Sequence, residues 1–105
     1  MEDISVTDLA ARMKSDDAPT LIDVREPDEY AFARIEGAQL KPLGDIMEWS
    51  QELDREQEYV MHCHTGQRSA YAAQVLRQMG FKKVRNLIGG IDAWSVQVDP
   101  RVPRY

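Results

Sequence analysis

Short apolar segments of two different periodicities alternate along this chain, and this alternation restricts the fold more than any other feature of the sequence. Apolar residues first recur at the spacing of one helix face, at Val6, Leu9, Ala10 and Met13. Strand-like segments follow at 21–24, 38–41, 59–62 and 84–87. Alternating helices and strands are typical of α/β domains. We therefore expect an α/β fold with a mostly parallel central sheet flanked by helices.

Capping and breaking residues predict where the helices begin and end. Ser5 can cap the first helix, with Asp8 three residues later in a capping-box arrangement. Pro27 suits the first turn of a second helix, which should run to about Ala33. Gly80 suits the end of the helix that follows the third strand-like segment. Two further helix faces are expected, one from Leu43, Ile46, Met47, Ser50 and Leu53 and one from Ile91, Trp94 and Val98.

Length and charge limit the classes of protein to consider. A chain of 105 residues fits one domain, in which residues 99–105 form an extended tail. The net charge of −5 argues against a nucleic-acid partner. The apolar segments are too short to span a membrane, and the acidic N-terminus at 1–3 does not resemble a secretory signal. The single cysteine excludes an internal disulfide, so we expect a reducing, cytoplasmic location.

The single cysteine, Cys63, lies between the strand expected at 59–62 and a helix. Residues 63–68, Cys-His-Thr-Gly-Gln-Arg, are called the cysteine loop below. The N–H groups that begin a helix lack helical partners, and with the helix dipole they form an anion site. A thiol there ionises more readily than a free cysteine. The loop therefore suits a nucleophilic sulfur beside a small anion, although a buried structural cysteine is the alternative.

Residues at the end of another strand should lie near this loop. Asp23 and Arg25 follow the segment at 21–24, and the ends of parallel strands share one edge of a sheet. Within the loop, Gly66 allows a sharp turn, and Arg68 adds a permanent positive charge.

Three stretches of the chain together resemble the rhodanese-like sulfurtransferases. The pattern Cys-x-x-Gly-x-Arg-Ser at 63–69 looks like the active loop of that family. Asp-Val-Arg-Glu at 23–26, with Glu-Tyr at 29–30 and Ile-Glu-Gly-Ala at 35–38, resembles its N-terminal signature. Residues 80–94, which end in Gly-Gly-Ile-Asp-Ala-Trp, resemble its C-terminal signature. The likeness covers nearly the whole chain in the right order and implies one rhodanese-like domain over residues 1–105.

The resemblance implies a sulfur-transfer reaction that needs no metal and no organic cofactor. Cys63 would attack the outer sulfur of a donor such as thiosulfate and hold that sulfur as a persulfide. Cyanide, a thiol or a sulfur-carrier protein would then accept the sulfur. Because the chain has no second cysteine, the acceptor must come from outside.

The resemblance also suggests roles for the residues around Cys63. The anion cradle would consist of His64, Thr65, Gly66, Gln67 and Arg68, mostly through backbone donors. Arg68 would contact the sulfonate of the donor or, alternatively, hold the loop to a carboxylate. Asp23, Arg25 and Ser69 would support the site, and we expect Arg25 to pair with a carboxylate such as Glu29. Arg34 replaces the histidine often found in the family, within the scaffold signature.

Two other functions remain open. Dual-specificity phosphatases and related arsenate reductases share the fold but place five residues between cysteine and arginine, which makes room for a tetrahedral phosphate. Four residues separate Cys63 from Arg68 here, which favours a single sulfur atom. A non-catalytic binding module is the other alternative, although such modules usually lack the cysteine.

The histidines and the tail leave further alternatives. His64 could act as a general base for Cys63. A metal site is disfavoured, because His62, Cys63 and His64 alternate in direction along an extended backbone. The tail, with its Asp-Pro and Val-Pro pairs before Tyr105, resembles rhodanese domains joined to adenylyltransferases of ubiquitin-like proteins. A free-standing relative and a domain from a larger protein are both compatible with this tail.

Overall fold

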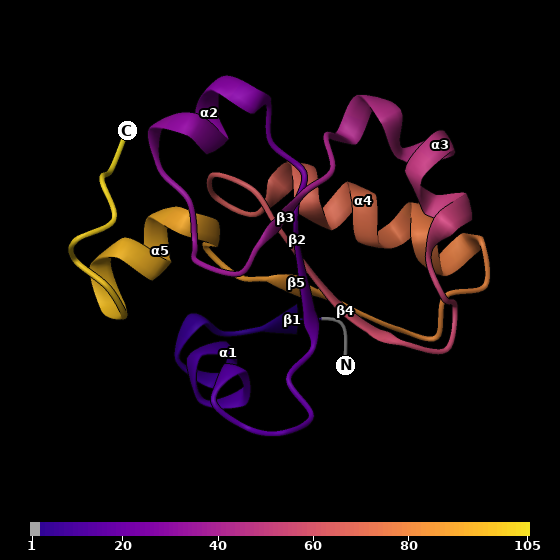
Figure 1. The fold of residues 1–105 in the computed structure, drawn as a ribbon, viewed down its shortest axis with the longest axis horizontal. Coiled ribbons are helices and arrows are strands. Elements are labelled where there is room, and N and C mark those ends of the chain that lie inside the picture. Colours follow the sequence, from indigo (N-terminus) through magenta and orange to yellow (C-terminus); the bar gives the residue numbers. More distant parts are fainter. Residues whose placement is uncertain (1–2) are drawn as a thin grey trace.

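The computed structural model describes residues 3–105 and arranges them around a parallel sheet of five strands (Figure 1). Met1 and Glu2, part of the acidic N-terminus, lie outside the described residues. The strands are β1 (Asp3–Ile4), β2 (Thr20–Asp23), β3 (Gln39–Leu40), β4 (Glu58–His62) and β5 (Lys83–Leu87). Their order across the sheet is β1-β5-β4-β2-β3, and every neighbouring pair is parallel. The expected α/β class is confirmed, whereas sequence periodicity did not detect the two-residue β1.

Helices cover both faces of the sheet because side chains alternate along each strand. Ile22 and Met61 belong to the apolar cluster on the face shared with α3 (Ile46–Trp49) and α4 (Gln67–Gln78). Leu21 and Val60, their neighbours in sequence, belong to the cluster on the face of α1 (Val6–Met13) and α5 (Gly90–Gln97) (Figure 1). None of the helices among residues 3–105 combines the length and apolarity that crossing a bilayer requires.

Local sequence signals place several helix ends correctly. The hydroxyl of Ser5 accepts a hydrogen bond of 3.1 Å from the N–H of Asp8 at the start of α1. The second predicted helix is α2 (Pro27–Phe32), with proline in its first turn. Gly80 follows α4 with φ +96°, a conformation that favours glycine.

The segment 43–53 differs from the single helix that its apolar spacing predicts. It consists of a 3₁₀ turn at Leu43–Asp45, the short α3, and a second 3₁₀ turn at Ser50–Glu52. A 3₁₀ turn has three residues per turn, so the inward face shifts along the segment. Met47, expected on the inner face, is 57% exposed, whereas Trp49 is 7% exposed and donates its indole N–H to the carbonyl of Pro42.

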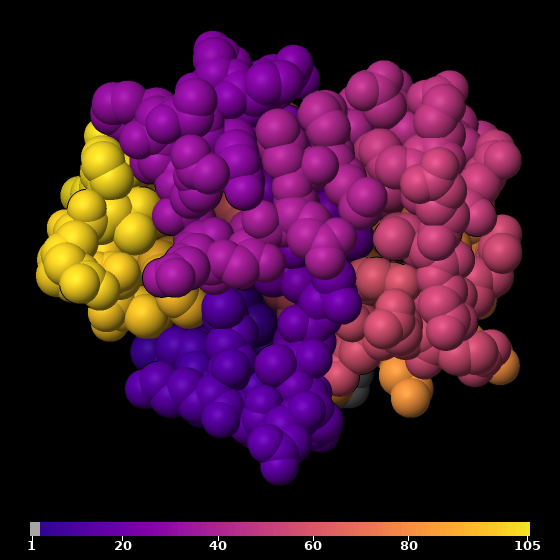
Figure 2. Space-filling model, viewed as in Figure 1, coloured from indigo at the N-terminus to yellow at the C-terminus, as the bar shows by residue number. Residues whose placement is uncertain are grey.

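The C-terminal residues, expected to be extended, contain a turn and fold back along the molecule. The N–H of Val102 donates to the carbonyl of Asp99 at 3.1 Å, and Val102 packs against the cluster on the α1–α5 face. Arg104 then forms an ion pair with Asp92 of α5. Figure 2 shows these residues (yellow) against the surface around α2 (purple), where the rings of Phe32 and Tyr105 meet edge to face at 6.0 Å.

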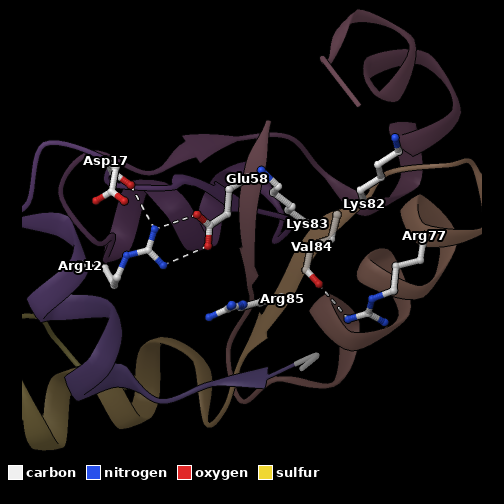
Figure 3. Close-up of a pocket in the computed structure, with 8 residues that line it drawn as sticks. All are labelled: Arg12, Asp17, Glu58, Arg77, Lys82, Lys83, Val84 and Arg85. Atoms are coloured by element: carbon white, nitrogen blue, oxygen red, sulfur yellow. Dashed lines mark hydrogen bonds and ion pairs between the residues drawn. The ribbon is translucent and has the colours of Figure 1, made fainter. Parts of the chain in front are cut away.

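A hollow of about 650 Å³ lies beside the amino-terminal ends of β4 and β5 (Figure 3). Its lining consists of Arg12, Asp17, Glu58, Arg77, Lys82, Lys83, Val84 and Arg85. In this hollow Glu58 neutralises Arg12 through two hydrogen bonds, of 2.7 and 3.0 Å. Cys63 follows the opposite, carboxyl end of β4, so this hollow is separate from the cysteine loop.

Candidate active site

The cysteine loop connects the end of β4 to the start of α4 in a sharp turn. Gly66 caps α4 with φ +112°, and a Cβ there would lie 3.5 Å from the N of Gly89 and from the O of Leu87. An L side chain is therefore disfavoured at this position by its backbone conformation and restricted by its neighbours.

The first residues of α5 hold the other side of the loop. The N–H of Ile91 donates to the carbonyl of Cys63 at 3.0 Å, and the N–H of Asp92 donates to the carbonyl of His64 at 3.1 Å. A Cβ on Gly90 would lie only 2.5 Å from both of those carbonyl oxygens. Gly90, which the sequence placed only within the C-terminal signature, thus allows α5 to approach the loop closely.

Three donors converge on the sulfur of Cys63. The N–H of Gly66 lies 3.2 Å from Sγ, and the N–H and hydroxyl of Ser69 both lie 3.4 Å from it. The hydroxyl of Ser69 also donates to Oδ1 of Asn86, whose amide in turn donates to the carbonyl of Gly66 at 3.1 Å. Because a hydroxyl has one proton, Ser69 can serve only one of its two acceptors at a time. Asn86 lies on β5, and no sequence pattern predicted it at the site.

This arrangement favours the thiolate. Cys63 is 1% exposed, and burial by itself opposes ionisation. Hydrogen bonds from the Ser69 hydroxyl and from the N–H groups of Ser69, Gly66 and Arg68 outweigh that effect and lower the pKa of Cys63 below its usual value. The remaining loop side chains differ in accessibility: Thr65 and Gln67 are exposed, and His64 is half-buried.

Arg68 is held by a carboxylate in this structure. Its Nη1 and Nη2 donate to Oε1 and Oε2 of Glu29 at 2.7 and 2.9 Å, a two-pronged pairing between α4 and α2. The hydrogen bonds from Arg68 are the main cause that lowers the pKa of Glu29 to about 2. This geometry matches the alternative role predicted for Arg68, in which it holds the loop to a carboxylate.

Arg25 does not pair with Glu29, so that sequence prediction was wrong. Its Nε and Nη2 donate to the carboxylate of Asp23 at 2.9 and 2.7 Å, and its Nη2 also reaches the carbonyl of Ala33 at 2.6 Å. Both side chains of the pair are fully buried. Because residues i and i+2 of an extended chain lie on the same side, Asp23 is closer to Arg25 than Glu29 is.

Burial lowers the pKa of His62, which lies 3.6 Å from the carboxylate of Asp23. Among residues 3–105, no group of three or more His, Cys, Asp or Glu side chains is arranged to hold a metal ion.

Tyr105 joins the two ion pairs and was not expected at the site. Its hydroxyl accepts from Nη1 of Arg25 and donates to Oε2 of Glu29, both at 2.8 Å. Its ring stacks on the ring of His64, with centroids 4.0 Å apart and an interplanar angle of 10°. A single aromatic residue at the end of a short tail gave no periodic signal from which this placement could be predicted.

Comparison with known proteins gives the same family along nearly the whole sequence. The chain is 38% identical over 112 residues to the rhodanese-like/PpiC domain-containing protein 12 of Arabidopsis thaliana, a chloroplastic protein. It is 37% identical over 93 residues to the putative sulfur carrier protein YrkF of Bacillus subtilis. The match to the plant protein includes the whole of this chain but only 38% of that protein. The match to YrkF includes 89% of this chain and half of that protein.

A relative and a solved structure of similar size match end to end. The putative sulfurtransferase YtwF of Bacillus subtilis is 38% identical over 101 residues, which are 96% of this chain and 97% of that protein. A crystal structure of a rhodanese-related protein from Thermoplasma volcanium superposes with a TM-score of 0.86 at 32% identity, with complete coverage of both chains. Residues 5–97 match the family model for the rhodanese-like domain. The chain therefore belongs to the rhodanese-like domain family, whose members include proteins named as sulfurtransferases.

Proposed function

We propose that this protein is a sulfurtransferase that carries sulfane sulfur on Cys63. The observation that carries the proposal is the convergence of Gly66 N–H, Ser69 N–H and Ser69 Oγ on Sγ of Cys63, at the start of α4. These donors suit a sulfur anion, because they favour the charged nucleophile before reaction and a persulfide anion after it.

Thiosulfate is the donor that we propose. The Cys63 thiolate attacks the outer sulfur, a new S–S bond forms, and the S–S bond of thiosulfate breaks with its electron pair leaving on sulfite. The product is a cysteine persulfide that carries one negative charge. Cyanide then attacks the outer sulfur of this persulfide, so that thiocyanate leaves and the thiolate returns. Both steps are displacements at sulfur, and neither needs an oxidant, a reductant or a metal.

In the cell, we propose that a thiol or a sulfur-carrier protein takes the place of cyanide. The chain has one cysteine, so no second thiol within it can receive the sulfur. The likeness to YrkF, whose name calls it a putative sulfur carrier, supports a protein acceptor in general terms. A cytoplasmic location also remains a proposal, based on the use of a single free thiol.

Arg68 and the rest of the cysteine loop would bind the donor in this scheme. For Arg68 to contact the sulfonate, its guanidinium has to exchange at least one contact with Glu29 for one with the donor. The backbone N–H of Gly66, by contrast, already points at Sγ of Cys63. We therefore propose backbone donors as the main anion cradle and Arg68 as a secondary contact.

Mass spectrometry of the intact protein tests the proposal directly. After incubation with thiosulfate, the protein should gain one sulfur atom, and cyanide should remove it with formation of thiocyanate. The Cys63→Ser variant should show neither change. If the wild-type protein gains no sulfur from thiosulfate or 3-mercaptopyruvate, the binding-module alternative is preferred. Hydrolysis of an aryl phosphate that depends on Cys63 would instead support the phosphatase alternative.

A further inference from the structure

Tyr105 closes a space between the cysteine loop and α2. On one side its ring lies flat against His64, the residue next to Cys63. On the other side its hydroxyl bonds to Glu29 in α2 and to the buried Arg25. Phe32, also in α2, meets the same ring at its edge. The phenol ring therefore spans the distance between the loop and the helix, with a contact at each end.

The contacts of Tyr105 also engage the polar side chains on its far side. Glu29 is occupied by Arg68 and by the phenol, and Arg25 is occupied by Asp23, Ala33 and the phenol. If the side chain is removed, a flat imidazole face, one guanidinium N–H and a carboxylate oxygen are left without this partner. The imidazole on one side and the two charged groups on the other are separated by a phenol side chain, because that of Tyr105 lies between them.

From this geometry we infer that Tyr105 is a specificity-determining residue that excludes the bulky part of a sulfur donor or acceptor from the mouth of the cysteine loop. The inference rests on the proposed function. A compact donor such as thiosulfate needs only the loop itself, whereas the aryl group of a thiosulfonate needs the space that the phenol occupies. Without the phenol, that aryl group can stack on His64 in its place.

Two donors with the same reacting sulfur but different size test the inference. The value of kcat/KM is measured for thiosulfate and for benzenethiosulfonate, with cyanide as acceptor, in the wild-type protein and in Tyr105→Ala. We expect Tyr105→Ala to raise the ratio of benzenethiosulfonate to thiosulfate by at least about tenfold, mainly through a lower KM for the aryl donor. Tyr105→Phe keeps the ring and should change the ratio by less than about threefold.

A matched control separates specificity from folding. Tyr71 in α4 is 59% exposed, and Tyr71→Ala should leave the ratio unchanged. If Tyr105 only stabilises the fold, Tyr105→Ala will reduce kcat/KM for both donors by the same factor, and the inference is then wrong. An unchanged ratio in a well-folded Tyr105→Ala protein contradicts it equally.

Chemical modification of Cys63 tests the same space without any sulfur transfer. The rates of reaction with iodoacetamide and with N-phenylmaleimide are compared. Tyr105→Ala should accelerate the aryl reagent at least about tenfold more than the small one. This result would support the inference even if no persulfide forms, in which case only the proposed function fails. Equal acceleration of both reagents would overturn the inference while leaving the sulfur-transfer proposal intact.

Discussion

Replacing Ser69 by alanine tests whether hydrogen bonds keep Cys63 ionised. The substitution removes the hydroxyl that lies 3.4 Å from Sγ but keeps the N–H of residue 69 at the same distance. A hydrogen bond to a charged group contributes about 1.5–3 kcal/mol. Because the Ser69 proton is shared between Cys63 and Asn86, we expect the lower end of that range. The thiolate population below the pKa should therefore fall about tenfold.

The pH dependence of alkylation by iodoacetamide measures this effect, since only the thiolate reacts. The midpoint of the rate profile should move to higher pH in Ser69→Ala, and the limiting rate at high pH should change little. Ser95→Ala is the matched control. The Ser95 hydroxyl is also buried, but it has no hydrogen-bond partner within residues 3–105. Its removal should leave the profile where it is.

The opposite results would refute the electrostatic reasoning. If Ser69→Ala has the wild-type profile, the hydroxyl bonds to Asn86 alone and the backbone amides are sufficient for the thiolate. If the midpoint moves to lower pH, burial of the sulfur has decreased, and the balance between desolvation and hydrogen bonding was judged wrongly.

Three further substitutions test other parts of the structure. The pKa of Glu29 lies at about 2 in the folded protein, against an ordinary value of 4.5. Its ion pair therefore stabilises the fold fully above pH 4.5, and this stabilisation is lost as the pH falls toward 2. In urea unfolding, Glu29→Gln should lose less stability than the wild-type protein between about pH 7 and pH 3. Gly90→Ala places a Cβ 2.5 Å from two loop carbonyl oxygens at φ +58° and should cost at least about 2 kcal/mol of unfolding free energy, whereas Gly44→Ala, which meets open space, should cost less than about 0.5 kcal/mol. Asp23→Ala leaves the buried Arg25 guanidinium without its carboxylate and should destabilise the fold by about 3–5 kcal/mol in the same urea assay, and a loss below about 1 kcal/mol would contradict the buried pairing.

The sequence was sufficient to predict helix ends that depend on residues close together along the chain. The cap at Ser5, the proline start of α2 and the glycine after α4 each depend on residues a few positions apart, and all were predicted. The segment 43–53 was harder, because its apolar spacing fits a helix while the indole of Trp49 bonds back to Pro42 and the chain tightens into 3₁₀ turns at both ends.

The pairing of charges was predicted less well because it depends on topology. The sequence prediction paired Glu29 with Arg25, which is close along the chain, and named no particular carboxylate for Arg68. The fold instead places α2 beside the start of α4, so that Arg68, 39 residues away, reaches the carboxylate. The contact of Tyr105 with Arg25 joins residues 80 positions apart and had no local signal.

These pairings explain how an anion can be stabilised in a protein of net charge −5. Each guanidinium near the loop is matched by a carboxylate, Arg25 by Asp23 and Arg68 by Glu29, so neither pair adds net charge beside the sulfur. The thiolate of Cys63 is then held mainly by fixed dipoles, namely the loop amides and one hydroxyl. Dipoles bound into a folded backbone stay in place when the charge moves from the thiolate to the outer sulfur of a persulfide. A free arginine would bind anionic donors more strongly, but in the proposed reaction with thiosulfate it would also hold the sulfite product.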